Sequence, residues 1–240
     1  MEVKTRFSLW QQCIVFCITL MCITSIHAAD NGNWSNVTFI YKTLSTWFYS
    51  LDLEQRTNFD NSHRNQSLIT PMLGYILSYR HDVELGYDLY LDNQMNEVEQ
   101  EPWEQDQYDL IIDGAKTLTL RTRFEQRFSR DNSQMALRLR TQLLWLWKGG
   151  INNKYSPVLF EEPFFNINHP SWVSNKTLSQ NRLFLGVDFP MTKRADFLLG
   201  YQNRVDYNTD NVLHQNILYL SFDYNFGAIV SPQIMLEQQT

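Results

Sequence analysis

Apolar and polar residues alternate along most of the chain beyond residue 45, and this alternation is the strongest pattern in the sequence. Between residues 82 and 91 every odd-numbered position is apolar, whereas the even-numbered positions include Asp82, Glu84 and Asp88. Successive side chains of a β-strand point to opposite faces, so this run predicts a strand with one apolar and one polar face. The pattern recurs over residues 46–57, 66–80, 118–128, 135–147, 182–190, 193–208 and 212–226.

Two weaker runs, 101–112 and 157–167, bring the predicted number of strands to ten, and segments 34–42 and 228–236 would raise it to twelve. No helical periodicity and no domain boundary interrupts the series. Tight turns alternate with long polar connections near residues 57–66, 93–100 and 167–178. Strands joined in this way predict an all-β, antiparallel up-and-down β-barrel that occupies residues 30–240 as a single domain.

The first 29 residues have the features of a cleaved secretory signal peptide. Lys4 and Arg6 precede a short apolar run, and Ala28 and Ala29 provide a small-residue cleavage site. The run is too short for a spanning helix, which needs roughly 20 residues. All three cysteines lie in this segment, so the mature protein is expected to have no disulfide and no cysteine-based site.

Alternation alone does not say whether the apolar faces point outward to lipid or inward to a cargo. The apolar faces of the eight clear strands carry no charged residue, and a charge there would cost about 2–4 kcal/mol at the bilayer midplane. Tyr and Trp favour membrane interfaces, where one end of the ring is apolar and the other is wet. We therefore predict a transmembrane barrel in the bacterial outer membrane, with a soluble exported lipid-binding barrel as an alternative. The predicted lipid-facing aromatic belt comprises Trp47, Tyr79, Trp145, Trp147, Tyr201, Tyr224 and Phe226.

The polar faces predict a charged lumen whose strongest feature is a ladder of arginines on two neighbouring strands. This arginine wall would face the carboxylates of Asp52, Glu54, Glu84 and Asp88 across the lumen. Charged rings of this kind select ions in pores, whereas paired charges in a small barrel fill and rigidify it. These two interpretations, a narrow pore-like role and a structural role, both remain open. The predicted lumen residues are Asp52, Glu54, Glu84, Asp88, Arg121, Arg123, Glu125, Arg127, Arg138, Arg140, Arg182 and Asp188.

Evidence for other chemistry is weaker. His169 and Ser171 would suit the base and nucleophile of an outer-membrane lipid hydrolase, but Pro170 and polar neighbours favour a loop. The acidic run from Glu97 to Asp109 could hold a divalent cation, although a solvated loop or rim is the commoner arrangement. The histidines show no metal-ligand spacing, so we expect no metal site. We also expect no enzyme activity and no cofactor. A formal net charge of −6 argues against nucleic-acid binding.

Seven short elements follow one another in the order Leu53-Glu54-Gln55-Arg56, Leu85-Gly86-Tyr87, Arg121-Thr122-Arg123-Phe124-Glu125-Gln126-Arg127-Phe128, Leu137-Arg138-Leu139-Arg140, Glu162-Pro163-Phe164-Phe165-Asn166, Asn181-Arg182-Leu183-Phe184-Leu185-Gly186 and Leu199-Gly200-Tyr201. In this order they resemble one bacterial family, the domain of unknown function 2490. The resemblance implies an exported outer-membrane-type β-barrel of Gram-negative bacteria and no particular activity. Outer-membrane lipid, lipopolysaccharide and the barrel-assembly machinery are the partners expected on this basis. Residues follow Phe226 up to Thr240, so the sequence does not identify which strand closes the barrel.

Overall fold

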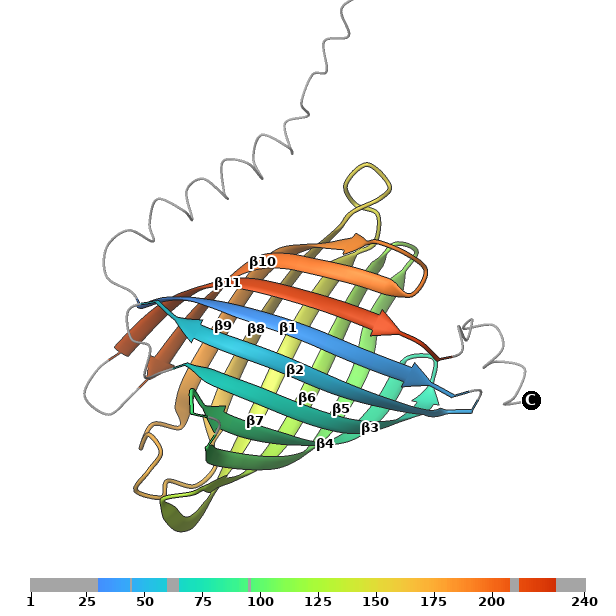
Figure 1. The fold of residues 1–240 in the computed structure, drawn as a ribbon. Coiled ribbons are helices and arrows are strands. Elements are labelled where there is room, and N and C mark those ends of the chain that lie inside the picture. The colour runs from blue at the N-terminus through green and yellow to red at the C-terminus, as the bar shows by residue number, and fades with distance from the viewer. Residues whose placement is uncertain (1–29, 44, 60–64, 95, 208–211, 228–240) are drawn as a thin grey trace, which may run out of the picture.

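The computed structural model describes residues 30–43, 45–59, 65–94, 96–207 and 212–227, which form a closed β-barrel (Figure 1). The predicted signal peptide (1–29) and the candidate strand 228–236 lie outside these residues. The strands are β1 (Asp30–Lys42), β2 (Trp47–Asn58), β3 (Gln66–Ser78), β4 (His81–Asp92), β5 (Glu97–Asp113), β6 (Lys116–Ser129), β7 (Asn132–Trp147), β8 (Ser156–Asn166), β9 (Leu178–Pro190), β10 (Ala195–Tyr207) and β11 (Val212–Asn225).

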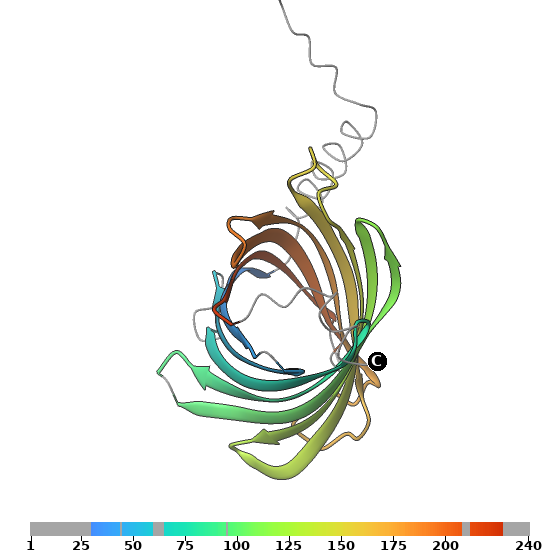
Figure 2. The same ribbon diagram turned by 90° about the vertical axis from the view of Figure 1, so that its right-hand side faces the viewer.

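Each strand pairs antiparallel with the next one along the chain, from β1 to β11. The ring closes between β1 and β11, which pair in parallel from Asp30↔Gln215 to Ile40↔Asn225. Figure 1 shows β1 between β2 and β11, and Figure 2 shows the strands closing into a ring. The prediction of an all-β barrel of about ten strands is confirmed, with eleven strands among the described residues. The parallel closure differs from the antiparallel pairing expected throughout, and it follows from an odd number of strands.

The prediction for residues 93–100 was wrong in part. They were assigned to a long polar connection, yet Glu97 already begins β5. Glu99 and Glu101 point inward from this part of β5 and pair with arginines of β6 and β7. A polar residue in a barrel lumen is compatible with regular strand structure, so polarity by itself did not mark a loop.

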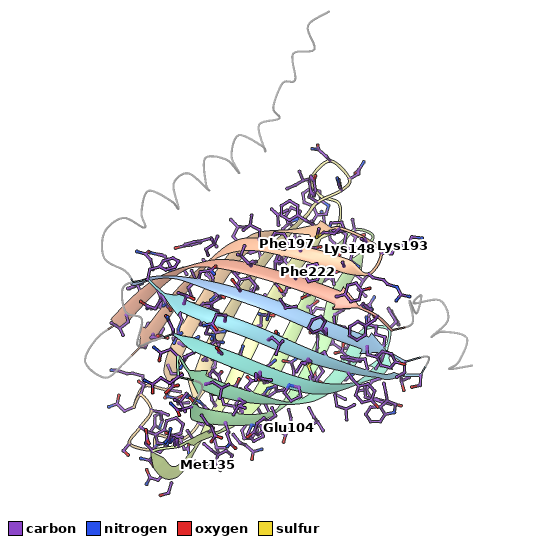
Figure 3. All side chains as sticks on the ribbon, in the orientation of Figure 1. Glu104, Met135, Lys148, Lys193, Phe197 and Phe222 are labelled. Atoms are coloured by element: carbon purple, nitrogen blue, oxygen red, sulfur yellow. The ribbon has the colours of Figure 1, made fainter. Side chains whose placement is uncertain are left out.

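The outer surface carries many exposed apolar side chains, although some large aromatic residues, such as Trp34 and Phe164, are buried inside the barrel. Phe197 and Phe222 face each other on β10 and β11, and both are labelled in Figure 3. The same figure labels Met135 at one end of the barrel and Lys148 and Lys193 at the other. Among the residues described, none forms a helix with the length and hydropathy that a membrane crossing requires.

Three carboxylates interrupt this apolar surface on strands that the sequence marked only weakly. Glu104 and Asp106 are exposed on the outward face of β5, and Glu161 is exposed on that of β8. His81 lies 2.6 Å from Asp106, and Asn181 donates a hydrogen bond to Glu161. The uncharged outer face expected from the eight clear strands therefore does not extend to β5 and β8.

Candidate functional site

The lumen contains a connected network of arginines and buried carboxylates. Glu125 is 0% exposed and accepts hydrogen bonds from Arg138 and, at 2.8 Å, from Arg140. Glu162 on β8 accepts from the guanidinium of Arg140 at 2.9 Å and from that of Arg121 at 2.7 Å. Alternation on β6, β7 and β8 brings these groups to one wall, because every second side chain points inward.

Glu101 is a second centre of the same network. It is 1% exposed and lies 2.7 Å from Arg127 and 3.0 Å from Arg138. Tyr90 donates a hydrogen bond of 3.1 Å to its other oxygen. Sequence reasoning did not assign Glu101 or Glu162 to the lumen. The alternation of Glu99, Glu101, Trp103 and Gln105 was the signal that could have identified the first of them.

Aromatic rings separate and orient the guanidinium groups. The guanidinium carbon of Arg123 lies 3.7 Å from the centre of a Trp103 ring, and Trp103 donates to Asp88 at 2.7 Å. The Trp34 ring contacts both Arg56 and Arg182, whose guanidinium carbons lie 4.2 and 4.9 Å from its centre. Stacking of this kind limits the orientations available to arginine without neutralising its charge.

The remaining predicted lumen carboxylates have varied partners. Asp52 accepts from Asn36 at 2.5 Å, Glu54 pairs with Arg56 of the same strand, and Glu84 accepts from Gln105. Asp188 is half-buried on β9, opposite Ser156 of β8.

The predicted opposition of an arginine wall and an acidic wall is therefore only partly present. Asp88 of β4 lies 3.7 Å from Arg123 of β6, two strands away. The other arginines of the ladder pair chiefly with Glu99, Glu101, Glu125 and Glu162, which come from β5, β6 and β8.

A chamber of about 260 Å³ remains beside this network. Its lining combines arginines with carboxylates, aromatic rings and amides. The residues that line it include Trp34, Asp52, Glu54, Arg56, Asp88, Arg121, Arg123, Arg140, Glu162, Arg182 and Gln202.

The residues predicted as an aromatic belt gather at one end of the barrel. With the exception of Tyr201, which lies in the middle of β10, they are near the end where β1 finishes. Trp47 packs edge-on against Tyr75 with 4.7 Å between ring centres, and Phe226 lies 5.6 Å from Tyr224. The structure thus places six of the seven predicted belt residues near one rim of the barrel.

The alternative hydrolase residues lie in the connection between β8 and β9. His169 and Ser171 are both exposed, and Ser171 accepts a hydrogen bond of 3.2 Å from Asn132. None of the hydrogen bonds between described residues joins the histidine to the serine. Within the described ranges, no group of three or more His, Cys, Asp or Glu side chains is arranged to hold a metal ion.

The Trp103 ring packs directly against Gly86, where a larger side chain would collide with it. A Cβ atom at residue 86 would lie 2.1 Å from that ring. We expect Gly86→Val to displace Trp103 from Asp88 and Arg123 and to destabilise the barrel by about 1–3 kcal/mol, as overpacking does. Urea unfolding of the purified protein in detergent, followed by gel mobility without heating, measures this loss. Ala115→Val is the control, because it adds similar bulk at an exposed turn position. The neighbouring Gly114 is unsuitable because it has a positive φ. Equal unfolding midpoints for Gly86→Val and Ala115→Val would contradict the prediction.

Comparison with known proteins identifies the family. The sequence profile of a family described as "Protein of unknown function (DUF2490)" matches residues 31–216. The chain belongs to this family. The resemblance predicted from the ordered sequence elements is thereby confirmed. An uncharacterized protein of Methylorubrum extorquens is 23% identical to this DUF2490 chain over 184 residues, which are 73% of the chain and 78% of that relative. A solved structure described as the NanC porin in a rhombohedral crystal form is similar over 72% of this chain and 84% of that chain, with a TM-score of 0.49 and 11% identity.

Proposed function

We propose that this DUF2490 protein is an outer-membrane β-barrel of a Gram-negative bacterium, exported by its N-terminal signal peptide. The outward position of leucines such as Leu85, Leu199 and Leu218 supports this proposal, because exposed apolar residues on adjacent strands favour lipid over water. The aromatic cluster at one rim fits a membrane interface. Outer-membrane lipid, lipopolysaccharide and the barrel-assembly machinery are its proposed partners.

The proposed role is that of a structural or narrow pore-like barrel without covalent catalysis. The observation that carries this role is the arginine–carboxylate network along one wall of the lumen, centred on Glu101, Glu125 and Glu162. Paired charges of this kind stabilise a closed barrel and leave room beside them for water and small ions. A polar, partly filled lumen restricts passage by size and charge.

Planar-bilayer recordings test the pore-like role. We expect the wild-type protein to give small unit conductances, and Arg121→Ala to increase them severalfold because it removes a long side chain from the chamber wall. Loss of one positive charge should also shift permeability towards cations. Arg130→Ala, at the exposed turn between β6 and β7, is the control and should leave the unit conductance unchanged.

Silent insertion of both the wild-type protein and Arg121→Ala would contradict the pore and favour the structural role. Cell fractionation separately tests the location. Recovery of the protein as a soluble monomer without detergent would overturn the membrane proposal and favour an exported lipid-binding barrel.

A further inference from the structure

Three buried hydrogen-bond donors of the chamber wall have no acceptor among the described residues. They are Nε of Arg140, Nε of Arg182 and Nε2 of Gln202. All three side chains line the chamber, and Gln202 is only 2% exposed. Buried polar groups are almost always hydrogen-bonded, so a cluster of unpaired donors around one chamber points to an acceptor that is not part of the chain.

The charges of the chamber favour the same kind of partner. Its wall holds five arginines and four carboxylates, Asp52, Glu54, Asp88 and Glu162. Each of these carboxylates already accepts a hydrogen bond from a neighbouring side chain. The buried lining atoms that lack a partner among the described residues are all donors. The lining itself holds one arginine more than carboxylates, and Arg140 also pairs with Glu125 outside the lining.

Arg182 is the arginine best placed to serve a ligand. Its contact with Glu162, at 3.5 Å, is longer than those of Arg121 and Arg140 with the same carboxylate. Its guanidinium carbon lies over the rings of Trp34 and Phe164, at 4.9 and 4.5 Å. The aromatic contacts hold the guanidinium plane while leaving its Nε donor unpaired among the described residues. An oriented guanidinium is suited to bidentate recognition of a carboxylate or phosphate.

We propose that this chamber binds a small oxyanion, a carboxylate or a phosphate, through Arg182, Gln202 and Arg140. A volume of about 260 Å³ accommodates a small organic acid or inorganic phosphate and excludes larger solutes. The inference goes beyond the pore-like role, since a chamber of this kind can bind a ligand whether or not ions pass through the barrel.

Calorimetric titration of the full-length mature barrel in detergent tests the proposal. Succinate and inorganic phosphate are the two probes, and erythritol is the uncharged control for succinate. We expect saturable binding of at least one anion and none of erythritol, and the stronger anion identifies the ligand class. Absence of binding by both anions, or equal binding of erythritol, would overturn the proposal.

Two substitutions locate the site. Gln202→Leu removes a donor at nearly constant volume and charge, and Arg182→Gln removes the stacked guanidinium. Each should weaken binding at least about tenfold, as expected for loss of a hydrogen bond to a charged group. Arg204→Gln is the matched control. Arg204 pairs with Asp206 on the neighbouring strand to Arg182 and does not line the chamber, so this variant should bind like the wild type.

Folding of every variant is checked by its heat-modifiable gel mobility. If Arg182→Gln does not fold, the result for Gln202→Leu decides. Unchanged affinity in a folded Gln202→Leu barrel would overturn the assigned site. Anion binding by a protein that inserts silently would leave this site intact while refuting the pore, so the two proposals fail separately.

Discussion

Glu125→Gln is expected to destabilise the barrel by about 3–5 kcal/mol, the range found when one partner of a buried ion pair is removed. Glu125 is fully buried and is shared by Arg138 and Arg140. The glutamine keeps the size of the side chain but removes the negative charge, so two buried guanidinium groups lose a common counter-ion. Glu101 still contacts Arg138 and Glu162 still contacts Arg140, and these contacts limit the loss to the lower part of this range.

Urea titration in detergent, with folded and unfolded forms separated by gel mobility, measures the effect of Glu125→Gln. Glu104→Gln is the matched control because it makes the same chemical change on β5 at an exposed outward position. The control should unfold at nearly the wild-type urea concentration. Equal stability of the two variants would show that the lumen charges do not hold the barrel together.

A second large effect is expected for an arginine placed on the outer surface. Leu199 faces outward on β10, between Leu220 of β11 and Val187 of β9. It lies along the strand between Phe197, near the aromatic rim, and Asn203, towards the other end. In a membrane, Leu199→Arg should cost about 2–4 kcal/mol, because a guanidinium in hydrocarbon loses its hydration. Refolding yield into lipid vesicles and unfolding in those vesicles measure this cost.

Met191→Arg provides the control for the outer surface. Met191 is exposed in the connection between β9 and β10, where a charge remains in water. This variant should refold and unfold like the wild type. A Leu199→Arg protein that is as stable as Met191→Arg in vesicles would contradict contact between this surface and lipid.

Strand positions could be predicted from the sequence because period-two alternation is a local property. The runs at 118–128 and 135–147 correspond to β6 and β7, which pair as expected through a short turn. Errors arose where polarity had two explanations. The start of β5 was assigned to a loop, because acidic residues are as common in solvated connections as in a charged lumen.

The partners of the arginines could not be predicted from the sequence. The sequence indicated that Arg138 and Arg140 would share a face, but Glu101 and Glu162 reach them from β5 and β8. Those contacts depend on the register of each strand pair, on the tilt of the strands and on the closure of the ring. The unpaired donors of Arg182 and Gln202 are likewise visible only when residues from separate strands surround one chamber.

The order of amino acids thus determined an all-β chain with an apolar and a charged face, because alternate side chains of any strand separate onto opposite faces. Only the tertiary structure decided which charges meet, how the first and last described strands join and where a chamber remains. These features require atoms distant in the chain to approach within a few ångströms, and a local pattern contains no information on that distance.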